Sequence, residues 1–280
     1  MTEIEVAIES IWPERAPIVG MVHLMPLPGS PRWGASMGAV FSRATADAEA
    51  LTKAGFDGIL VENYADVPFL KGPVPAETVA AMTAAVLAVR DATGLPVGVN
   101  VLRNDAHAAV AIATATGARF IRVNVHAGSM WTDQGLVEGR AADTLRLRSK
   151  LGGCVAILAD VHVKHATPPS GSDIGTAASD SWRRGLADAL VVSGSGTGVP
   201  TETRDLEAVR AAVPEAYILV GSGVTPENAS NVLALADGAI VGSSVMRGGI
   251  AGAGVDADRA RLLIDAARDC LGSGLKRGDP

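Results

Sequence analysis

Two carboxylates end apolar runs of the sequence and are candidates for acid–base chemistry. Glu62 closes the run GILVE, and Asp160 closes the run VAILAD. An apolar environment disfavours the charged form of a carboxylate, so we expect the pKa of Glu62 to rise toward neutrality. A carboxylic acid with such a pKa takes up and releases protons near pH 7. Glu62 is therefore our first candidate for general base or acid, and Asp160 is the second.

Further polar side chains recur at intervals of two residues, the spacing that places side chains on one face of a strand. The two sets are Asp160, His162 and Lys164 in one run and Arg122, Asn124 and His126 in another. Burying so many polar groups is costly unless they pair or meet a ligand, and clustered ionisable groups in a cleft indicate function. The candidate catalytic residues are Glu62, Asp160, Lys164, His126, His162, Arg122, Asn100 and His23.

Lys164 has two interpretations. Its amine either stabilises a developing enolate or forms a Schiff base with a carbonyl substrate. Alternatively it forms a structural salt bridge with Asp160 or Glu62. Both interpretations stay open at the level of sequence.

A metal site is a less favoured alternative. Imidazole and carboxylate ligands would come from His126, Asp160, His162 and Glu62, all ordinary ligands of transition metals. The chain carries no H-E-x-x-H or other compact ligand motif, so we expect neither a metal nor another cofactor.

The stretch from Tyr217 to Val245 contains two apolar runs that each end in glycine and serine, YILVGSGVTPEN and ADGAIVGSSV. Glycines let the backbone approach an anion closely, and serine hydroxyls add donors. Thr225 followed by Pro226 reads as an N-cap and a first helical residue, so we expect a helix to start there. We predict a phosphate site formed by Gly194, Ser195, Gly221, Ser222, Gly223, Gly242, Ser243 and Ser244.

Eight short apolar runs, separated by stretches with helical spacing, must position these residues. The runs are Ile18 to His23, Gly58 to Glu62, Val97 to Leu102, Phe120 to His126, Val155 to Val161, Ala189 to Ser193, Tyr217 to Gly221 and Ala239 to Gly242. The repeat fits a (β/α)8 TIM barrel, an α/β fold whose active sites lie at the carboxyl ends of the strands and whose last two loops commonly bind phosphate. An open doubly wound sheet is the alternative, but no G-x-G-x-x-G follows the first run.

The 280 residues are read as one TIM-barrel domain. Residues 1–16 are expected to form a segment that caps the barrel bottom through Ile4, Ile8, Ile11 and Trp12, and residues 272–280 a flexible tail. The long segment from Ala127 to Glu138 is expected to be a loop that covers the substrate.

Composition excludes several classes of protein. The net charge of -6 and the low aromatic content argue against a nucleic-acid partner. No apolar run approaches the length of a spanning helix, and the acidic N-terminus is unlike a secretory signal. We therefore expect a cytoplasmic protein without membrane insertion, in which Cys154 and Cys270 are reduced. A homo-oligomer remains open, because an interface loop and a lid look alike in sequence.

Several blocks together resemble the BtpA/SgcQ family. They are GMVHLMPLPGSP, VENYADVPF, GVNVLRND, FIRVNVHAGSMWTDQGLVEGRAADTLRLR, ILADVHVKHA, LVVSGSGTG and VGSGVTPENASNVLALADGAIVGSS. The resemblance runs from about Pro17 to Val245 and implies a TIM barrel. The founding association of that family is with the biogenesis of photosystem I, so the resemblance also implies a possible assembly role.

A weaker similarity links the chain to the tryptophan synthase α subunit, which cleaves a carbon–carbon bond in a glycerol-phosphate substrate. It rests on Glu62 with the VPF that follows, on the SGSGTG loop and on the GSGV and GSS turns. This similarity implies an acid–base role for Glu62 and phosphate contacts from the glycines and serines of those turns. The block DVHVKHA has no counterpart there.

We therefore expect an enzyme that acts on a phosphorylated sugar or nucleotide-derived metabolite by proton transfer beside a carbonyl, as a lyase or an isomerase. In this hypothesis Glu62 and Asp160 exchange protons with the substrate, while Lys164, His126 or Arg122 stabilises the oxyanion. The alternative is a noncatalytic assembly or stability factor for a membrane protein complex.

Overall fold

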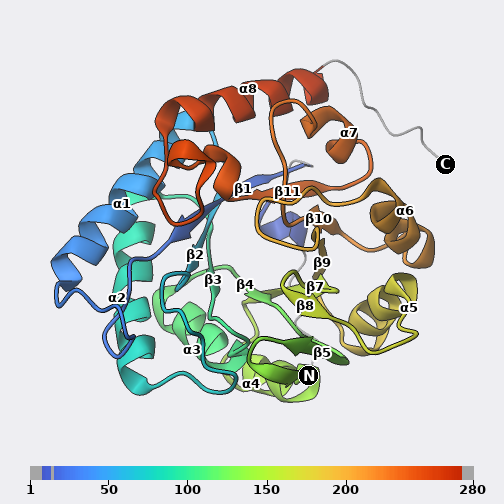
Figure 1. Ribbon diagram of the computed structural model, residues 1–280, viewed down its shortest axis with the longest axis horizontal. Coiled ribbons are helices and arrows are strands. Elements are labelled where there is room, and N and C mark those ends of the chain that lie inside the picture. Colours follow the sequence, from blue (N-terminus) through green and yellow to red (C-terminus); the bar gives the residue numbers. More distant parts are fainter. Residues whose placement is uncertain (1–7, 14–15, 273–280) are drawn as a thin grey trace.

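A computed structural model describes residues 8–13 and 16–272 of the chain. Within these residues eight parallel strands close a barrel in the order β1-β11-β10-β9-β7-β4-β3-β2 (Figure 1). Their bounds are β1 Ile18–His23, β2 Gly58–Glu62, β3 Val97–Asn100, β4 Phe120–Val123, β7 Ala156–Val161, β9 Ala189–Val192, β10 Ile218–Val220 and β11 Gly238–Val241. The first and last strands pair directly, with Ile18 opposite Ala239. The chain is thus a (β/α)8 TIM barrel, as its period predicts.

Helices surround the barrel. They are α1 Met37–Ala54, α2 Ala76–Thr93, α3 Ala106–Thr116, α4 Ala141–Lys150, α5 Ile174–Ser179, α6 Thr203–Ala212, α7 Ala229–Leu233 and α8 Ala257–Gly272, with short turns η1 Ile8–Ser10, η2 Asp180–Arg184, η3 Ser243–Val245 and η4 Arg247–Gly249. Side chains of Ser36 and Asp105 accept hydrogen bonds from the first turns of α1 and α3, which satisfies donors that a helix leaves free. Gly55 and Gly117 end the same helices in the left-handed conformation.

The barrel interior is apolar over most of its depth. Phe120 lies at its centre, and a Cβ added at Gly98 would lie 2.1 Å from the phenylalanine ring. A side chain at residue 98 would therefore compete for space that the ring already fills. The cluster around Phe120 also contains Met21, Leu60, Leu158 and Ile240 from neighbouring strands.

Residues near the start of the chain pack into this interior cluster. Ile8, Ile11 and Trp12 are buried there, the Trp12 ring centroid lies 5.0 Å from that of Phe120, and Trp12 Nε1 donates to Asp57 O at 3.0 Å. Ile4 and residues 273–280 of the expected tail lie outside the described residues.

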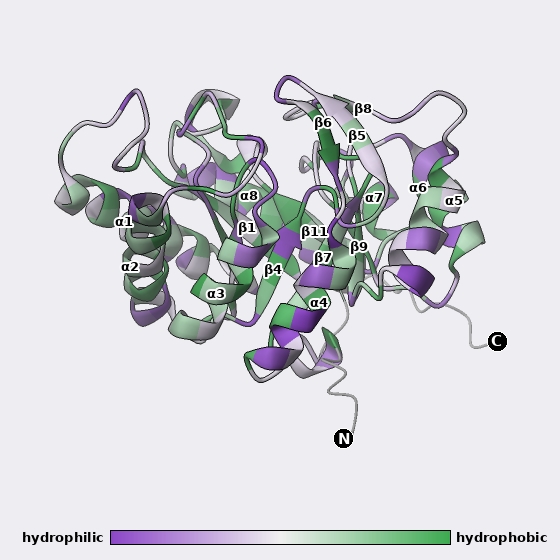
Figure 2. Cartoon of the chain, turned by 90° about the horizontal axis from the view of Figure 1, so that it is seen from below, coloured by the Kyte–Doolittle hydropathy of each residue, from purple (hydrophilic) through white to green (hydrophobic). Residues whose placement is uncertain are grey.

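Two expectations about local structure are wrong. The segment read as a loop from Ala127 to Glu138 contains the hairpin of β5 Ser129–Thr132 and β6 Gly135–Glu138, and β8 Ala166–Thr167 pairs with β5. Figure 2 shows this small sheet at one end of the barrel. The helix expected directly after Thr225 begins at Ala229, because Asn228 accepts from Thr225 N at 2.8 Å and holds residues 225–228 in a turn.

No helix in the described part of the chain has both the length and the apolar character needed to cross a bilayer.

Candidate active site

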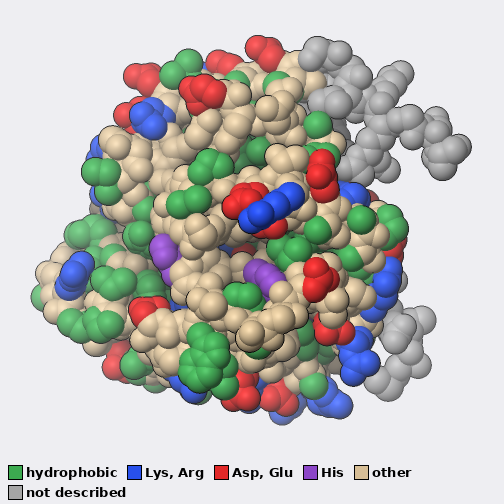
Figure 3. Space-filling model, turned by 45° about the vertical axis from the view of Figure 1, so that its right-hand side comes forward, with side chains coloured by type: hydrophobic (Ala, Val, Ile, Leu, Met, Phe, Trp, Pro, Cys, Tyr) green, Lys and Arg blue, Asp and Glu red, His purple; other side chains and the backbone are tan. Residues whose placement is uncertain are grey.

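A layer of polar side chains lies above the apolar interior, where the strands end. Because side chains alternate along a strand, the residues two positions beyond the interior cluster face the same enclosed space. This layer consists of His23, Glu62, Asn100, Arg122, Asp160 and Ser193, all buried. On the side of the loops the surface is hollowed, with histidine side chains at the edge of the hollow (Figure 3).

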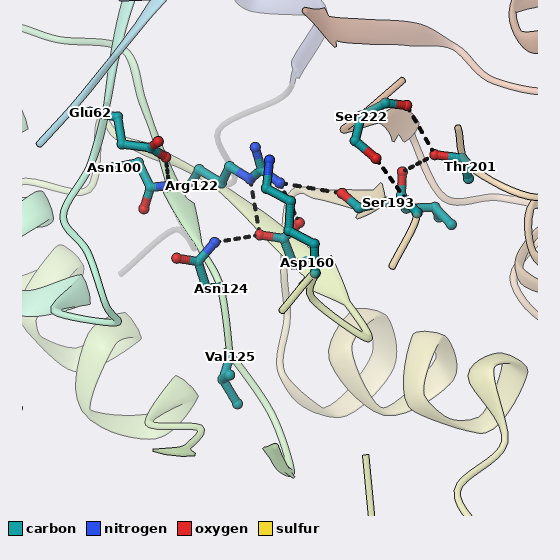
Figure 4. Close-up of polar contacts among 12 residues, drawn as sticks. Glu62, Asn100, Arg122, Asn124, Val125, Asp160, Ser193, Thr201 and Ser222 are labelled. Carbon is teal, nitrogen blue, oxygen red and sulfur yellow. Dashed lines mark hydrogen bonds and ion pairs between the residues drawn. The ribbon is translucent and has the colours of Figure 1, made fainter. Parts of the chain in front are cut away.

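Arg122 and Asp160 form a buried ion pair with two hydrogen bonds. Arg122 Nε donates to Asp160 Oδ2 at 2.9 Å, and Nη2 donates to Oδ1 at 2.7 Å. Asn124 adds a third donor to the carboxylate at 2.8 Å. Burial alone would lower the pKa of Arg122, but Asp160 raises it above its ordinary value, so the guanidinium keeps its charge. Figure 4 shows Arg122 extending between Asp160 and Glu62.

Glu62 lacks such an ion pair. Its Oε2 accepts from Asn100 Nδ2 at 2.6 Å, and its Oε1 lies 3.6 Å from His23 Nε2. Burial raises the pKa of Glu62 above its ordinary value, although Lys164 and Arg122 oppose the rise. The direction agrees with the expectation from the apolar run that precedes this residue.

His23 is uncharged in this layer. Burial, reinforced by Lys164 and Arg122, lowers the pKa of His23 to about 3. Gly252 N donates to His23 Nδ1 at 3.1 Å, so the single proton of the neutral ring belongs on Nε2, toward Glu62. The Tyr64 ring stacks on His23 with centroids 4.2 Å apart.

Lys164 lies beside this layer, but not because it continues the alternation of a strand, as the sequence had predicted. Strand β7 ends at Val161, and both His162 and His165 adopt left-handed backbone with φ values of 52° and 56°. Such residues are uncommon outside glycine and cluster at functional sites. Between them Val163 packs into a small apolar cluster, whereas the Lys164 amine lies within electrostatic reach of Glu62, Asp160 and Arg122.

Two of the predicted residues point elsewhere. His126 Nε2 lies 2.7 Å from Gly185 O, and His162 Nε2 lies 3.0 Å from Ser172 Oγ. Neither ring meets Glu62 or Asp160, because β4 ends at Val123 and β7 at Val161, and alternation fails beyond a strand end. The expectation that each histidine shares a face with its set is therefore wrong. Among the described residues no group of three or more His, Cys, Asp or Glu side chains is arranged to hold a metal ion.

Part of the predicted phosphate site is already occupied by internal hydrogen bonds. Gly194 N donates to Ser222 Oγ at 2.8 Å, Ser222 Oγ donates to Val199 O at 3.0 Å, and Gly221 N donates to Val192 O at 2.8 Å. Moreover, a Cβ at Gly221 would lie 3.1 Å from Arg122 Nη2, which places this glycine beside the ion pair. We conclude that the amides of Gly194 and Gly221 and the hydroxyl of Ser222 shape the loops and are not free to bind an anion.

Other amides of the same turns are free. Gly223, Ser243 and Ser244 have no backbone N–H hydrogen bond to any residue that the structure describes. Ser243 and Ser244 begin the turn η3, which follows β11 directly after Gly242, and Ser195 is exposed on the loop after β9. A Cβ at Gly198 would lie 3.1 Å from Ser243 Oγ, so that loop approaches η3 closely.

Several further residues surround the layer, and the sequence did not assign a role to any of them. Tyr64, Arg103, His165, Thr197 and Arg259 come from five different loops or helices. Arg103 Nη2 donates to Lys164 O at 2.8 Å, Thr197 Oγ1 lies 2.8 Å from His165 Nε2, and Arg259 Nε donates to Ser244 O at 2.8 Å. Of these, Arg103, directly after the run Val97 to Leu102, and His165, directly after Lys164, carried a signal in the sequence as polar residues that follow apolar runs.

The comparisons with known proteins cover most of the chain. The model of the BtpA family matches residues 14–269. A Photosystem I biogenesis protein BtpA of Synechocystis sp. is 47% identical over 92% of this chain and 90% of its own length. An uncharacterised protein of Thermococcus kodakarensis is 44% identical over 94% of this chain and 99% of its own length.

Solved structures with the same fold are much less similar in sequence. The native KDPGal structure matches with a TM-score of 0.58 and 18% identity, over 93% of this chain and 98% of that one. A phosphoribosyl anthranilate isomerase from Thermus thermophilus matches with a TM-score of 0.57 and 13% identity, over 90% and 98%. At these identities the matches show the fold alone.

Proposed function

The chain belongs to the BtpA family, and on that premise we propose that it is an enzyme that binds a phosphorylated small molecule and transfers a proton beside its carbonyl group. The substrate class is a phosphorylated sugar or a nucleotide-derived metabolite, and the reaction class is lyase or isomerase. The single observation that supports this proposal best is a buried Glu62 with a raised pKa in one layer with the free amine of Lys164.

In this proposal Glu62 removes and returns the proton. Burial raises its pKa above the ordinary value, and a carboxylate with a raised pKa is a stronger base than an ordinary one. Negative charge that develops on the substrate carbonyl would face Arg122, and a fixed cation in a site of low dielectric stabilises such charge strongly.

In this proposal Asp160 does not have the acid–base role that was expected from the sequence. Two hydrogen bonds from Arg122 and one from Asn124 occupy its oxygens. A carboxylate bound in this way holds the guanidinium in place, and we propose that it orients Arg122 and does not exchange a proton with the substrate.

The phosphate group would bind the free amides of Gly223, Ser243 and Ser244. These follow β10 and β11, the last two strands of the barrel, and unpaired amides at such loop ends suit an anion. Arg259 would add a positive charge beside Ser244.

Titration with inorganic phosphate, followed by calorimetry and thermal unfolding, tests the anion site. We expect saturable binding that stabilises the protein by about 2.7 kcal/mol at 100 times the dissociation constant. Ser243→Asp should weaken this binding at least about tenfold, because a carboxylate there repels the anion. Ser42→Asp, an exposed serine on α1, is the matched control. Equal binding by both variants would refute the phosphate site.

A noncatalytic assembly factor is the second candidate, and the name of the Synechocystis relative favours it. A comparably similar relative comes from an archaeon, so an activity common to these proteins would not depend on a photosystem. A Glu62→Gln variant that folds normally and restores full cellular function in a strain lacking the native protein would favour the assembly role. Loss of that function in the folded variant supports an enzyme.

A further inference from the structure

The amine of Lys164 is an unpaired group in a site crowded with charge. It forms no hydrogen bond and no ion pair with any residue that the structure describes. Of the two carboxylates nearby, Asp160 is occupied by Arg122 and Asn124, and Glu62 is bonded to Asn100. A structural lysine at a partly buried position ordinarily finds an acidic partner. The sequence left open a structural salt bridge between Lys164 and Asp160 or Glu62. No such salt bridge forms among the described residues.

The backbone around Lys164 is fixed on both sides. Arg103 donates to the carbonyl oxygen of Lys164 itself. His165 N donates to Ser195 O at 3.0 Å, and the His165 ring contacts Thr197. Together with the left-handed residues His162 and His165, these bonds hold the backbone that carries the side chain in one place, and a reacting group requires such positioning.

The surroundings also favour the uncharged form of the amine. Burial, reinforced by Arg122 and Arg103 and opposed by Glu62 and Asp160, lowers the pKa of Lys164 to about 8. An ordinary lysine, with a pKa of about 10.4, is almost entirely protonated near neutrality. A lysine beside other cations and away from solvent is a recognised kind of amine nucleophile.

We propose that Lys164 condenses with the carbonyl carbon of the substrate to form an imine, so that the substrate is a phosphorylated aldehyde or ketone. This inference rests on the proposed function, since it names how that same site takes hold of a carbonyl. It assigns to Lys164 the covalent role, and to Glu62 the proton transfers that accompany it.

The chemistry balances without an oxidant or a reductant. The neutral amine attacks the carbonyl carbon, a C–N bond forms, and the C=O π electrons move to oxygen, which takes a proton from Glu62. The nitrogen of this carbinolamine returns one proton to Glu62. The hydroxyl then leaves as water after receiving a proton from Glu62, and the nitrogen lone pair forms the C=N bond of a protonated imine. Overall, a neutral amine, a protonated Glu62 and a carbonyl give a protonated imine, an ionised Glu62 and one water.

Borohydride trapping tests the inference on the wild-type protein. The protein is incubated with dihydroxyacetone phosphate or glyceraldehyde 3-phosphate, reduced with sodium borohydride, digested and analysed by mass spectrometry. We expect a secondary amine on Lys164 in at least about tenfold excess over the exposed Lys53 of the same sample. Lys164→Arg should abolish the adduct at this position and leave the modification of Lys53 unchanged. Modification confined to exposed lysines with both compounds overturns the inference.

A parallel phosphate titration separates this inference from the proposed function. If inorganic phosphate binds at the Ser243 turn and no Lys164 adduct forms, the covalent role is wrong and the anion site stands. If Lys164 is trapped equally well with unphosphorylated dihydroxyacetone and phosphate does not bind, the covalent role stands and the phosphate part of the proposed function fails. Lys164→Arg should bind phosphate like the wild type, which also checks that this variant is folded.

Discussion

The Nε2 atom of His23 lies 3.6 Å from Oε1 of Glu62. The histidine ring is uncharged, because burial lowers its pKa to about 3. An uncharged imidazole leaves the carboxyl without a cationic partner on this side. Burial therefore outweighs the attraction of Lys164 and Arg122, and the pKa of Glu62 rises. His23 therefore adds no charge to the layer beside Arg122 and Asp160.

Replacing Glu62 by Gln should slow proton exchange while leaving phosphate binding intact. The amide keeps the shape of the side chain but cannot accept a proton, and loss of a general base costs about 10²- to 10⁴-fold. Exchange of a carbon-bound proton of dihydroxyacetone phosphate with deuterium oxide, followed by NMR, measures the effect. Glu138→Gln, at an exposed glutamate of β6, should exchange at the wild-type rate. An unchanged rate in Glu62→Gln would rule out this residue as the base.

The neutral His23 should make stability depend on pH. Its pKa is about 3 in the folded protein and 6.5 as the ordinary value, so between these values the unfolded chain binds the extra proton. Stability from His23 is therefore fully present above pH 6.5 and falls as the pH decreases toward 3, by at most about 1.4 kcal/mol per pH unit.

Glu62 contributes with the opposite sign, because its folded pKa is raised. The His23 effect is best measured by urea unfolding of Glu62→Gln against a His23→Gln, Glu62→Gln double variant. We expect the single variant to lose more stability than the double variant between pH 6.5 and pH 4. Parallel curves would show that His23 titrates normally in the folded protein.

Asp160→Asn should destabilise the protein strongly. It removes one partner of a buried pair and leaves the Arg122 charge uncompensated, which costs about 3–5 kcal/mol. Asp143→Asn breaks an exposed pair with Arg140 and should cost less than about 1 kcal/mol. Chemical denaturation of both variants gives the comparison, and similar losses would mean that the buried pair is not the stronger one.

The rate of borohydride trapping at Lys164 should rise with pH and level off just above pH 8. The neutral amine is the nucleophile, and its fraction saturates above a pKa of about 8. A lysine with an ordinary pKa would keep gaining reactivity up to about pH 10.4. A trapping rate that still increases steeply from pH 9 to pH 10 would contradict the lowered pKa.

The sequence predicted the barrel well because burial on both faces leaves a clear apolar run for each strand. The bounds of β1 and β2 are those predicted. The position of Glu62 followed from the same pattern, since a polar residue that ends a buried strand faces the mouth of the barrel.

What the sequence did not predict lies beyond the strand ends. Left-handed residues at His162 and His165 interrupt the alternation, turn the His162 ring outward and still bring Lys164 into the site. The bond between Gly194 N and Ser222 Oγ joins loops 28 residues apart, and no local pattern reports a contact of that range. The stacking of Tyr64 on His23 and the hydrogen bond from Gly252 N to His23 also join distant parts of the chain, so no local pattern predicts them.

The hydroxyl of Ser222 links the loop after β9 to the loop after β10, because it accepts from Gly194 and donates to Val199. The first of these loops also carries Thr197, which contacts His165 next to the reactive lysine. These bonds tie the loop that carries Thr197 to the turn at Gly223. In the proposed enzyme, the turn that would hold the phosphate and the loop that contacts His165 beside Lys164 therefore form one hydrogen-bonded unit.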